Sequence, residues 1–280
     1  MIIWLASYPK SGNTWLRCIV SSLLYSKSGN FDFELLKKIR QFPEKQFFKD
    51  IITDFSNFNE IKKNWVTAQE KINLSKNIRI FKTHQGKYTL GEHNFTNNKN
   101  TLAVIYIVRD PRNLVKSLSH HFNFSLDRAC KFLMSPEIIG NGEKWEKKKY
   151  GMYNLIGKWN DHYRSWTINK DDLLLIKYED LVKDVEYEMN KIIDFLKRYI
   201  KFETNINKNK KIIETTSFEN LQEMERQGKF IENVLSQDKN KINFFHLGPE
   251  NEWKDTLNKN TIKKIENNFS KEMEELGYLS

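Results

Sequence analysis

The chain has 280 residues, of which 39% are hydrophobic and 29% are charged. This composition is typical of a folded globular protein and argues against a disordered or fibrous chain. No apolar run approaches the ~20 residues that a membrane span needs, and Lys10 interrupts the apolar N-terminus too early for a secretory signal. Two cysteines, Cys18 and Cys130, are too few for a disulfide framework and form no zinc-like cluster. We therefore expect one domain spanning residues 1–280 and a cytoplasmic location.

The chain is basic, since 46 Lys and Arg residues outnumber 36 Asp and Glu residues and the formal net charge is +10. A positive field favours anionic partners, such as nucleic acid, an acidic membrane surface or a phosphorylated small molecule. Lysine can also serve only to hydrate a surface. The basic residues are scattered along the sequence and do not form a tail or an arginine-rich stripe. Charge alone leaves the partner open.

The predicted elements alternate between apolar strands and amphipathic helices. Strands are predicted at residues 2–8, 79–83, 102–108 and 173–176. A first helix is predicted from the loop at residue 12 to about residue 24, and a mostly helical polar stretch follows to about residue 75. Another helix begins at residue 111. Further helices are predicted at 152–166, 179–199 and 261–276. Polar surface connections are expected at 201–211 and 229–243. Because continuous apolar strands fit positions buried on both faces, the pattern predicts an α/β fold with a central parallel sheet flanked by helices.

The segment Tyr8–Trp15, with the sequence YPKSGNTW, joins the first predicted strand to the first helix. Such a junction directs backbone N–H groups and the positive end of a helix at one spot, where they can bind an anion. Gly12 permits close approach of the backbone, Lys10 adds a charge, and Ser11 and Thr14 add hydroxyl groups. A plain turn with a helix cap is the structural alternative. The position of the loop directly after a buried strand favours the anion site.

The loop does not match the Walker pattern of ATP- and GTP-binding proteins. That pattern places a lysine after its second glycine and a Mg²⁺-binding hydroxyl next to it. Here Lys10 precedes the glycine, and the pattern occurs nowhere else in the chain. The sequence therefore predicts an anion site of another kind.

The motifs resemble those of the sulfotransferases that use 3′-phosphoadenosine 5′-phosphosulfate (PAPS). The first loop is similar to their phosphosulfate-binding loop, YPKSGTTW, and residues 104–122 (VIYIVRDPRNLVKSLSHHF) are similar to their second signature. Further similar segments follow in the expected order: Lys82–His84, Tyr178–Leu181, Thr216–Phe218 and Phe244–Trp253. The resemblance spans nearly the whole chain and implies a three-layer sandwich like that of P-loop NTPases.

The resemblance also implies which residues bind the donor. Lys10 would lie beside the oxygen that bridges phosphate and sulfate, and Arg109 and Ser117 would hold the 3′-phosphate. Trp15 would offer adenine a stacking face. The complete set of donor-binding residues is expected to be Lys10, Ser11, Gly12, Asn13, Thr14, Trp15, Arg109, Ser117, Tyr178, Thr216, Ser217, Phe218, Phe245, His246 and Gly248.

Two positions depart from the family's pattern. Asn13 replaces a common threonine, and its amide can still donate to a phosphate. His246 and Leu247 stand where an Arg-Lys pair usually precedes the glycine. Because leucine carries no charge, we expect Arg109 and Ser117 to carry more of the 3′-phosphate binding.

The catalytic residues implied by the resemblance are Lys10, His84 and Ser117. His84 follows a predicted strand, and strand ends of α/β sheets direct side chains at the ligand. An imidazole can accept a proton from an acceptor hydroxyl at neutral pH, so His84 is the candidate general base. His120 and His121 are competitors that follow a helix and are interpreted as structural or as part of an acceptor pocket.

Several of these residues have structural alternatives. Arg109 could pair with Asp110 or Asp180, as arginines at buried strand ends often do. Thr216 or Ser217 could simply cap a helix. These alternatives are decided only by three-dimensional contacts.

The sequence therefore predicts an enzyme that transfers a sulfuryl group from PAPS to a hydroxyl or amine of a small-molecule acceptor by in-line displacement. No metal, nucleic acid or membrane span is expected, and the oligomeric state is left open. One alternative is a P-loop-like nucleotide or small-molecule kinase, against which the position of Lys10 argues. The other is a non-catalytic nucleic-acid-binding protein, which the charge permits but no recognition motif supports.

Overall fold

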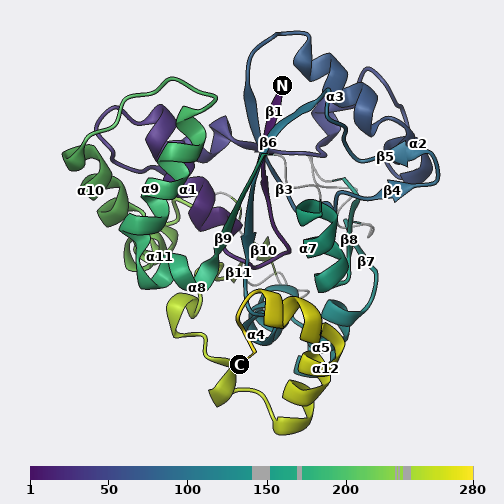
Figure 1. Ribbon diagram of the computed structural model, residues 1–280, viewed down its shortest axis with the longest axis vertical. Helices are drawn as coiled ribbons and strands as arrows, with labels where there is room; N and C mark the ends of the chain where they lie inside the picture. The colour runs from purple at the N-terminus through teal and green to yellow at the C-terminus, as the bar shows by residue number, and fades with distance from the viewer. Residues whose placement is uncertain (141–151, 169–171, 231, 233, 236–240, 280) are drawn as a thin grey trace. The chain divides into compact units, whose positions relative to one another are not determined.

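The computed structural model describes residues 1–140, 152–168, 172–230, 232, 234–235 and 241–279 (Figure 1). The chain divides into two compact units, and each is described by itself. The first unit comprises Met1–Tyr8, Ile39–Ile107 and Ser135–Leu175. The second comprises Pro9–Lys38, Val108–Met134 and Ile176–Ser280. The prediction of one domain over residues 1–280 stays a prediction.

The first unit contains the parallel sheet. Its elements are β1 (Ile2–Ala6), β2 (Arg40–Gln41), η2 (Lys45–Phe47), α2 (Phe58–Lys63), α3 (Trp65–Asn73), β3 (Arg79–Thr83), β4 (Thr89–Leu90), β5 (His93–Asn94), β6 (Thr101–Val108), β7 (Glu137–Ile139), β8 (Asn154–Gly157), α7 (Trp159–Thr167) and β9 (Leu173–Lys177). The last residues of β6 and β9 begin the second unit.

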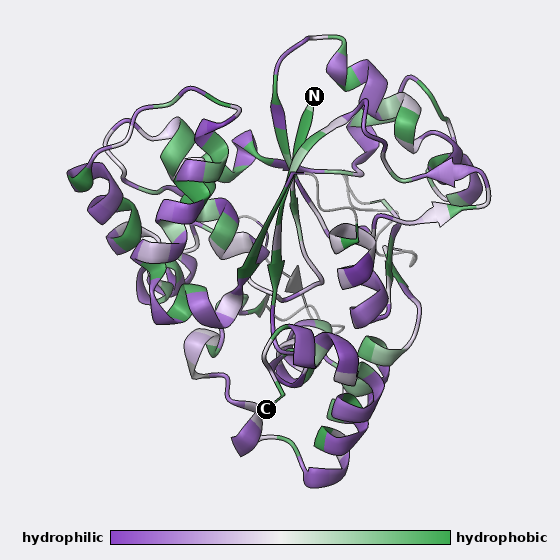
Figure 2. Ribbon diagram, in the orientation of Figure 1, coloured by the Kyte–Doolittle hydropathy of each residue, from purple (hydrophilic) through white to green (hydrophobic). Residues whose placement is uncertain are grey.

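Five strands form this sheet in the order β2-β3-β1-β6-β9. Strand β1 pairs in parallel with β3 on one side and with β6 on the other, so that Trp4 lies opposite Phe81 and Val104. All five residues of β1 are buried, as expected for a central strand with both faces covered. Figure 2 shows these central strands as hydrophobic. Because β1 and β3 run in parallel, the residues that follow them emerge at the same edge of the sheet.

Aromatic side chains fill the core of the first unit around Trp4. Its ring lies 5.4 Å from that of Phe95, 5.6 Å from Phe42 and 6.1 Å from Trp166 of α7, measured between ring centroids. Trp65 of α3 contacts Phe95 edge-on at 5.5 Å. Tilted and edge-on arrangements are the favourable geometries for aromatic pairs, so these rings add to the stabilisation from burial.

The second unit is mostly helical. Its elements are α1 (Asn13–Tyr25), η1 (Phe33–Lys38), α4 (Pro111–Phe122), α5 (Leu126–Met134), α8 (Tyr178–Lys183), α9 (Val185–Lys197), α10 (Ile206–Thr215), α11 (Phe218–Arg226), β10 (Val234–Leu235), β11 (Lys241–Ile242), η3 (Gly248–Glu250), η4 (Trp253–Asp255) and α12 (Lys259–Glu275). Helix α12 lies against α4 and α5. Helix α4 begins as expected, with Pro111 in its first turn and the Asp110 side chain accepting the Arg112 N–H.

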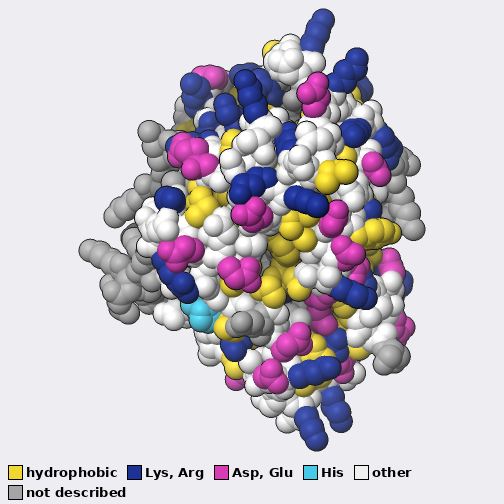
Figure 3. All heavy atoms as spheres, turned by 90° about the vertical axis from the view of Figure 1, so that its left-hand side faces the viewer, with side chains coloured by type: hydrophobic (Ala, Val, Ile, Leu, Met, Phe, Trp, Pro, Cys, Tyr) yellow, Lys and Arg dark blue, Asp and Glu magenta, His cyan; other side chains and the backbone are white. Residues whose placement is uncertain are grey.

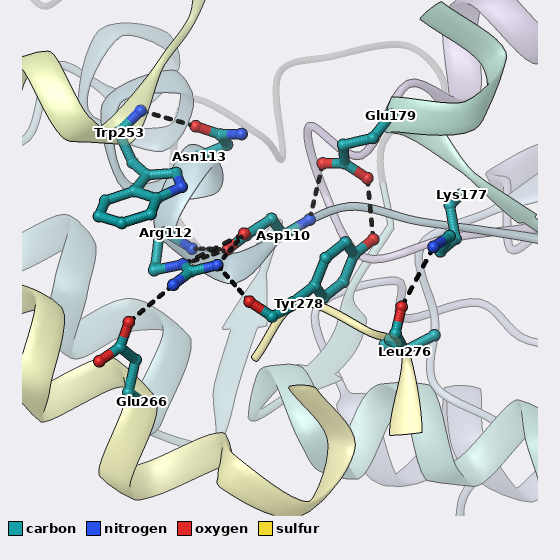
Figure 4. A network of polar contacts seen from close by, with 9 residues as sticks. All are labelled: Asp110, Arg112, Asn113, Lys177, Glu179, Trp253, Glu266, Leu276 and Tyr278. Atoms are coloured by element: carbon teal, nitrogen blue, oxygen red, sulfur yellow. Dashed lines mark hydrogen bonds and ion pairs between the residues drawn. The ribbon is translucent and has the colours of Figure 1, made fainter. Parts of the chain in front are cut away.

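A buried polar network connects the end of the chain to the residues that follow β6 (Figure 4). The Arg112 guanidinium donates to Asp110 at 2.6 Å, to Glu266 at 2.6 Å and to the Tyr278 carbonyl oxygen at 2.8 Å. The Tyr278 hydroxyl donates to Glu179, whose other oxygen accepts the Asp110 N–H at 3.0 Å. Charge-assisted bonds of this kind are stronger than neutral ones, so the network holds the backbone beside Arg109 in place.

The helix predicted over residues 152–166 is wrong in its first half. Residues Asn154–Gly157 form β8, which pairs with β7 in antiparallel fashion, and the helix α7 begins only at Trp159. Gly157 has a φ of 73°, a conformation that glycine adopts readily and that ends the strand before the helix. The pairing partner of β8 is β7, which ends 15 residues earlier at Ile139, so the periodicity within 152–166 could not identify the strand.

Three other predicted elements need correction. The helix over 179–199 is two helices, because Asp184 ends α8 and its side chain caps α9 by accepting the Tyr187 N–H. The connection at 201–211 is wrong from Ile206 onwards, where α10 begins. The stretch to residue 75 contains short 3-10 helices and β2 besides α2 and α3. The connection at 229–243 lies partly outside the described residues.

The other expected strands and the last helix are confirmed, and with them the predicted α/β fold with a central parallel sheet. No helix in the described part of the chain is long and apolar enough to cross a bilayer.

Candidate functional site

The loop between β1 and α1 has the backbone geometry of an anion site. Lys10 has a φ of 69° and Gly12 a φ of 99°, both in the left-handed region. Gly12 is also the N-cap of α1, and no side chain caps this helix. Left-handed residues separated by one residue, as here, direct successive backbone N–H groups into a concave nest. The N-terminal end of the helix adds its positive dipole. Lys10, a non-glycine residue in this conformation, carries backbone strain of the kind found at ligand-binding sites.

Two buried polar atoms in the second unit indicate what kind of ligand fits this site. The Ser11 side chain is fully buried and its Oγ has no hydrogen-bond partner among the described residues. Arg109 is 5% exposed, and its Nε also has no partner within the described part of the chain. A buried polar atom left unpaired costs about 1–3 kcal/mol. The donors present therefore suit a ligand that brings anionic oxygens.

Arg109 lies among three other predicted donor-binding residues. Its guanidinium donates to the carbonyl oxygens of Lys10 at 3.4 Å and Gly248 at 3.2 Å, and it lies 4.0 Å from the centre of the Tyr178 ring. The alternative pair with Asp110 is not formed, because that carboxylate bonds Arg112. The structure thus brings the first loop, the end of β6, the start of α8 and the Gly248 turn together.

At Gly248 a larger residue would be strained and would displace the Phe218 ring. The φ of Gly248 is 52°, and a Cβ atom there would lie 2.3 Å from the Phe218 ring. Trp15 lies edge-on to Tyr178 at 6.0 Å, and its indole Nε1 has no hydrogen-bond partner in the described residues. Trp15 and Tyr178 thus lie beside each other in the second unit.

Ser117 lies on α4, and its Oγ accepts a hydrogen bond from the Asn251 amide at 3.0 Å. The same amide donates to the Asn113 carbonyl oxygen at 2.7 Å. Asn251 is 3% exposed, and it connects Ser117 to the segment that follows Gly248. The sequence reasoning did not single out Asn251, although it lies within the Phe244–Trp253 motif.

The remaining predicted donor-binding residues divide into caps and core. Thr216 ends α10 and donates to the Ile212 carbonyl oxygen, while Ser217 caps α11 by accepting the Asn220 N–H. The structure therefore supports the helix-cap alternative for these two side chains. Phe245 is buried in an aromatic and aliphatic cluster, away from solvent. Asn13 and Thr14 are buried in the first turn of α1.

His84 follows β3 in the first unit, and the backbone fixes its tautomer. Its Nδ1 lies 3.0 Å from the Ser7 carbonyl oxygen and 3.2 Å from the Ser7 hydroxyl. A carbonyl oxygen only accepts, so Nδ1 carries the proton in the neutral ring and Nε2 is the basic nitrogen. Ser7 is three residues before Lys10 in the chain. The sequence reasoning missed Ser7, whose role depends on the pairing of β1 with β3.

His162 of α7 forms a hydrogen bond to the backbone of His84, just after β3. Its Nε2 donates to the His84 carbonyl oxygen at 3.1 Å, and its Nδ1 accepts from the Tyr106 hydroxyl at 2.8 Å. Burial lowers the pKa of His162 from 6.5 to about 3, so the ring is neutral at physiological pH. The sequence reasoning missed His162 because its segment showed only helical periodicity.

The lowered pKa of His162 predicts a loss of stability in mild acid. The unfolded chain binds a proton below pH 6.5 while the folded chain does not until pH 3, so stability is fully present above pH 6.5 and falls as the pH decreases through this window. The expected slope is roughly 1.4 kcal/mol per pH unit. Urea unfolding between pH 7.5 and 5 measures it, with His162→Gln as the comparison. Parallel curves for the two proteins would contradict the prediction.

His120 and His121 lie at the end of α4. His120 Nε2 donates to the Asn243 carbonyl oxygen at 2.9 Å, and its ring stacks on that of His246. His121 lies edge-on to Phe244, whose ring also contacts the Lys10 ammonium at 3.8 Å. Both histidines belong to the second unit, together with the first loop.

Comparison with known proteins shows the family. The model of the sulfotransferase domain family matches residues 2–277. Sulfotransferase 1 family member D1 of Mus musculus is 26% identical over 275 residues, which cover 98% of this chain and 83% of the mouse protein. Amine sulfotransferase of Oryctolagus cuniculus is 24% identical over 98% of this chain and 81% of its own length.

Solved structures share the fold. A mouse sulfotransferase complexed with PAP superposes with a TM-score of 0.59 and 21% identity, covering 97% of this chain and 84% of that one. Retinol dehydratase in complex with androsterone and the inactive cofactor PAP gives a TM-score of 0.60 and 17% identity, over 97% of this chain and 80% of that one. The predicted fold class and the predicted resemblance are confirmed. The chain belongs to the sulfotransferase domain family.

Proposed function

We propose that this sulfotransferase takes its sulfuryl group from PAPS and transfers it to a hydroxyl or amine of a small-molecule acceptor. The observation that carries the proposal is the pair of buried, unpartnered polar atoms, Ser11 Oγ and Arg109 Nε, in a unit where the left-handed turn at Lys10 and Gly12 forms an anion nest. That related structures are complexed with PAP supports it.

Each residue has a defined task in this proposal. PAPS, when bound, supplies the sulfuryl group. Lys10 stabilises negative charge on the departing phosphate oxygen, and Ser11 and the N–H groups of α1 hold the 5′-phosphate. His84 Nε2 accepts the proton of the acceptor, while Ser7 keeps Nδ1 protonated. Arg109, with Ser117 on α4, receives the 3′-phosphate, and Ser117 also contributes to catalysis.

The base lies in the region of Trp15 and Tyr178, whose rings provide a flat face. Phe218, which lies against Gly248, borders the same turn. Thr216, Ser217 and Phe245 act indirectly in this proposal, because their side chains cap helices or fill the core. Phe245 anchors in the core the segment that carries Gly248.

The kinase alternative and the nucleic-acid alternative are both disfavoured. Lys10 precedes its glycine, which is the reverse of the Walker order. On the face drawn in Figure 3, Lys and Arg side chains alternate with Asp and Glu among the described residues and form no continuous basic stripe. A basic patch or stripe is the usual mark of a nucleic-acid site. The relative named cytosolic sulfotransferase 12, of Arabidopsis thaliana, supports a proposed cytoplasmic location.

Ligand-dependent thermal stability tests the donor. PAP should raise the melting temperature, since a ligand at ~100 times its dissociation constant stabilises the native state by about 2.7 kcal/mol. ATP with Mg²⁺ should have a much smaller effect. Stabilisation by ATP with Mg²⁺ but not by PAP would overturn the proposal and favour a kinase. A screen of phenols, alcohols and amines with radiolabelled PAPS would then identify the acceptor class.

Arg109→Ala should weaken PAP binding by about 2–3 kcal/mol, because it removes a charge-assisted contact to a phosphate. The loss should be selective: adenosine 5′-phosphate, which lacks the 3′-phosphate, should lose little. Calorimetric titration of both nucleotides measures this. Arg226→Ala, an exposed arginine of the same unit, is the control and should bind PAP normally. An equal loss for both nucleotides would make Arg109 a purely structural residue.

A further inference from the structure

Two histidines from distant parts of the second unit form a stacked pair. The rings of His120 and His246 have centroids 3.9 Å apart and planes inclined by only 8°. His120 belongs to α4, and its Nε2 donates to the Asn243 carbonyl oxygen. His246 is exposed. The pair therefore presents imidazole nitrogens that a ligand can reach.

Three basic side chains of the described residues act on the pKa of His246. They are His120 and Lys116, both of α4, and Lys10 of the first loop. Partial burial of the ring lowers the pKa of His246, and these three groups lower it further. From α11, Gln222 donates to the Phe245 and His246 carbonyl oxygens.

Glu225 of α11 is the acidic residue that bonds the backbone just before His246. Both carboxylate oxygens of Glu225 accept backbone N–H groups, those of Phe244 at 2.8 Å and Phe245 at 2.9 Å. Glu225 thus holds the backbone that precedes His246. The groups that act on the pKa of His246 include no carboxylate of the described residues that would balance a proton on its ring.

The neighbouring contacts indicate where a balancing anion would sit. Arg109 donates to the carbonyl oxygen of Gly248, two residues after His246, and its Nε is buried without a partner among the described residues. Ser117 lies on the same helix as His120, one turn earlier. A phosphate held by Arg109 and Ser117 would add two negative charges beside the imidazole pair.

We propose that the stacked His120–His246 pair is a phosphate-binding subsite of the donor site that takes up one proton when the 3′-phosphate of the nucleotide binds. The inference rests on the proposed function. Without a ligand His246 is neutral at physiological pH, because its pKa is lowered below 6.5. With a phosphate dianion, one imidazole becomes an imidazolium that donates to a phosphate oxygen and stacks on its neutral partner. The site would carry a cation only while the phosphate is bound. It would lack the permanently charged Arg-Lys pair that the resemblance implies at His246 and Leu247.

Proton uptake makes the affinity depend on pH. When one proton binds together with the ligand, the association constant falls by up to tenfold for each pH unit between the pKa of His246 in the free protein and its pKa in the complex. PAP affinity should therefore decrease by about tenfold to thirtyfold between pH 6.5 and 8. Adenosine 5′-phosphate, without the 3′-phosphate, should show a much weaker dependence.

Isothermal titration calorimetry of the full chain with PAP tests this at pH 6.5, 7, 7.5 and 8 in buffers of different ionisation enthalpy. We expect uptake of close to one proton in the wild type. In His246→Asn the uptake should disappear, and in His246→Arg the affinity should stay high at pH 8. The phosphate's own ionisation contributes equally in all proteins, so the difference between variants isolates the histidines. His93→Asn is the control and should resemble the wild type.

The outcomes separate this inference from the proposed function. If the folded protein fails to bind PAP at every pH, the proposed donor is wrong. If PAP binds with the same pH dependence in wild type and His246→Asn, the inference is overturned and the donor assignment stands. NMR titration of the wild-type histidines with and without PAP gives a second readout that needs no variant. An imidazole pKa that does not rise on binding would also overturn the inference.

Discussion

His84→Asn should lower the rate of sulfuryl transfer by about 10²–10⁴-fold, the usual contribution of a positioned general base. The asparagine amide can still donate to the Ser7 carbonyl oxygen, which His84 Nδ1 contacts at 3.0 Å, but it offers no basic nitrogen in place of Nε2. PAP affinity and the free energy of unfolding should therefore stay close to the wild-type values. Single-turnover transfer from radiolabelled PAPS measures the rate, and calorimetry measures PAP binding.

The control for this variant is His93→Asn, which changes a histidine of β5 in the same unit and should leave the rate unaltered. A matched decrease in rate and PAP affinity in His84→Asn would make His84 a scaffold residue. An unchanged rate would remove it from the mechanism and direct attention to His121.

Lys10→Met should reduce transfer from saturating PAPS by about 10²–10³-fold, the effect of removing one group that stabilises a developing negative charge. Methionine retains most of the apolar length of the side chain, so the contact with the Phe244 ring, now 3.8 Å from the ammonium, can persist. The loss in rate should exceed the loss in PAP affinity, because the charge on the departing oxygen is greatest in the transition state.

Lys27→Met is the matched control, since Lys27 is an exposed lysine just after the same helix. Its transfer rate should equal that of the wild type. Should Lys10→Met lose rate and affinity in equal proportion, Lys10 would act only in binding. Should it lose neither, the charge on the departing oxygen would have to be stabilised by another group.

The anion loop was predictable from the sequence because it is a local feature. Strand, loop and helix follow one another within about 25 residues, and the positions of Pro9 and Gly12 indicate the turn between them. The structure confirms β1 and α1 at these positions. Neighbouring residues determine such backbone geometry, so one short stretch of sequence suffices. The same holds for the helix at Pro111, whose cap and first turn are adjacent residues.

Contacts between distant segments could not be derived in this way. Arg109 donates to the Gly248 carbonyl oxygen, 139 residues further along, and His84 contacts Ser7, 77 residues before it. The sequence identified Arg109 and His84 as candidates but left open what each would touch. The alternative pair of Arg109 with Asp110 was equally compatible with the sequence, and only the competing contact of Asp110 with Arg112 removed it.

By itself, the sequence determined the alternation of strands and helices, the anion loop and the resemblance to the family, because each depends on residues close together in the chain. Only the tertiary structure decided that residues 154–157 form a strand, that His162 holds the His84 backbone and that His120 stacks on His246. These features depend on sheet register and on the path of long loops. Register and loop path are determined by the packing of the whole core, which no local pattern of residues encodes.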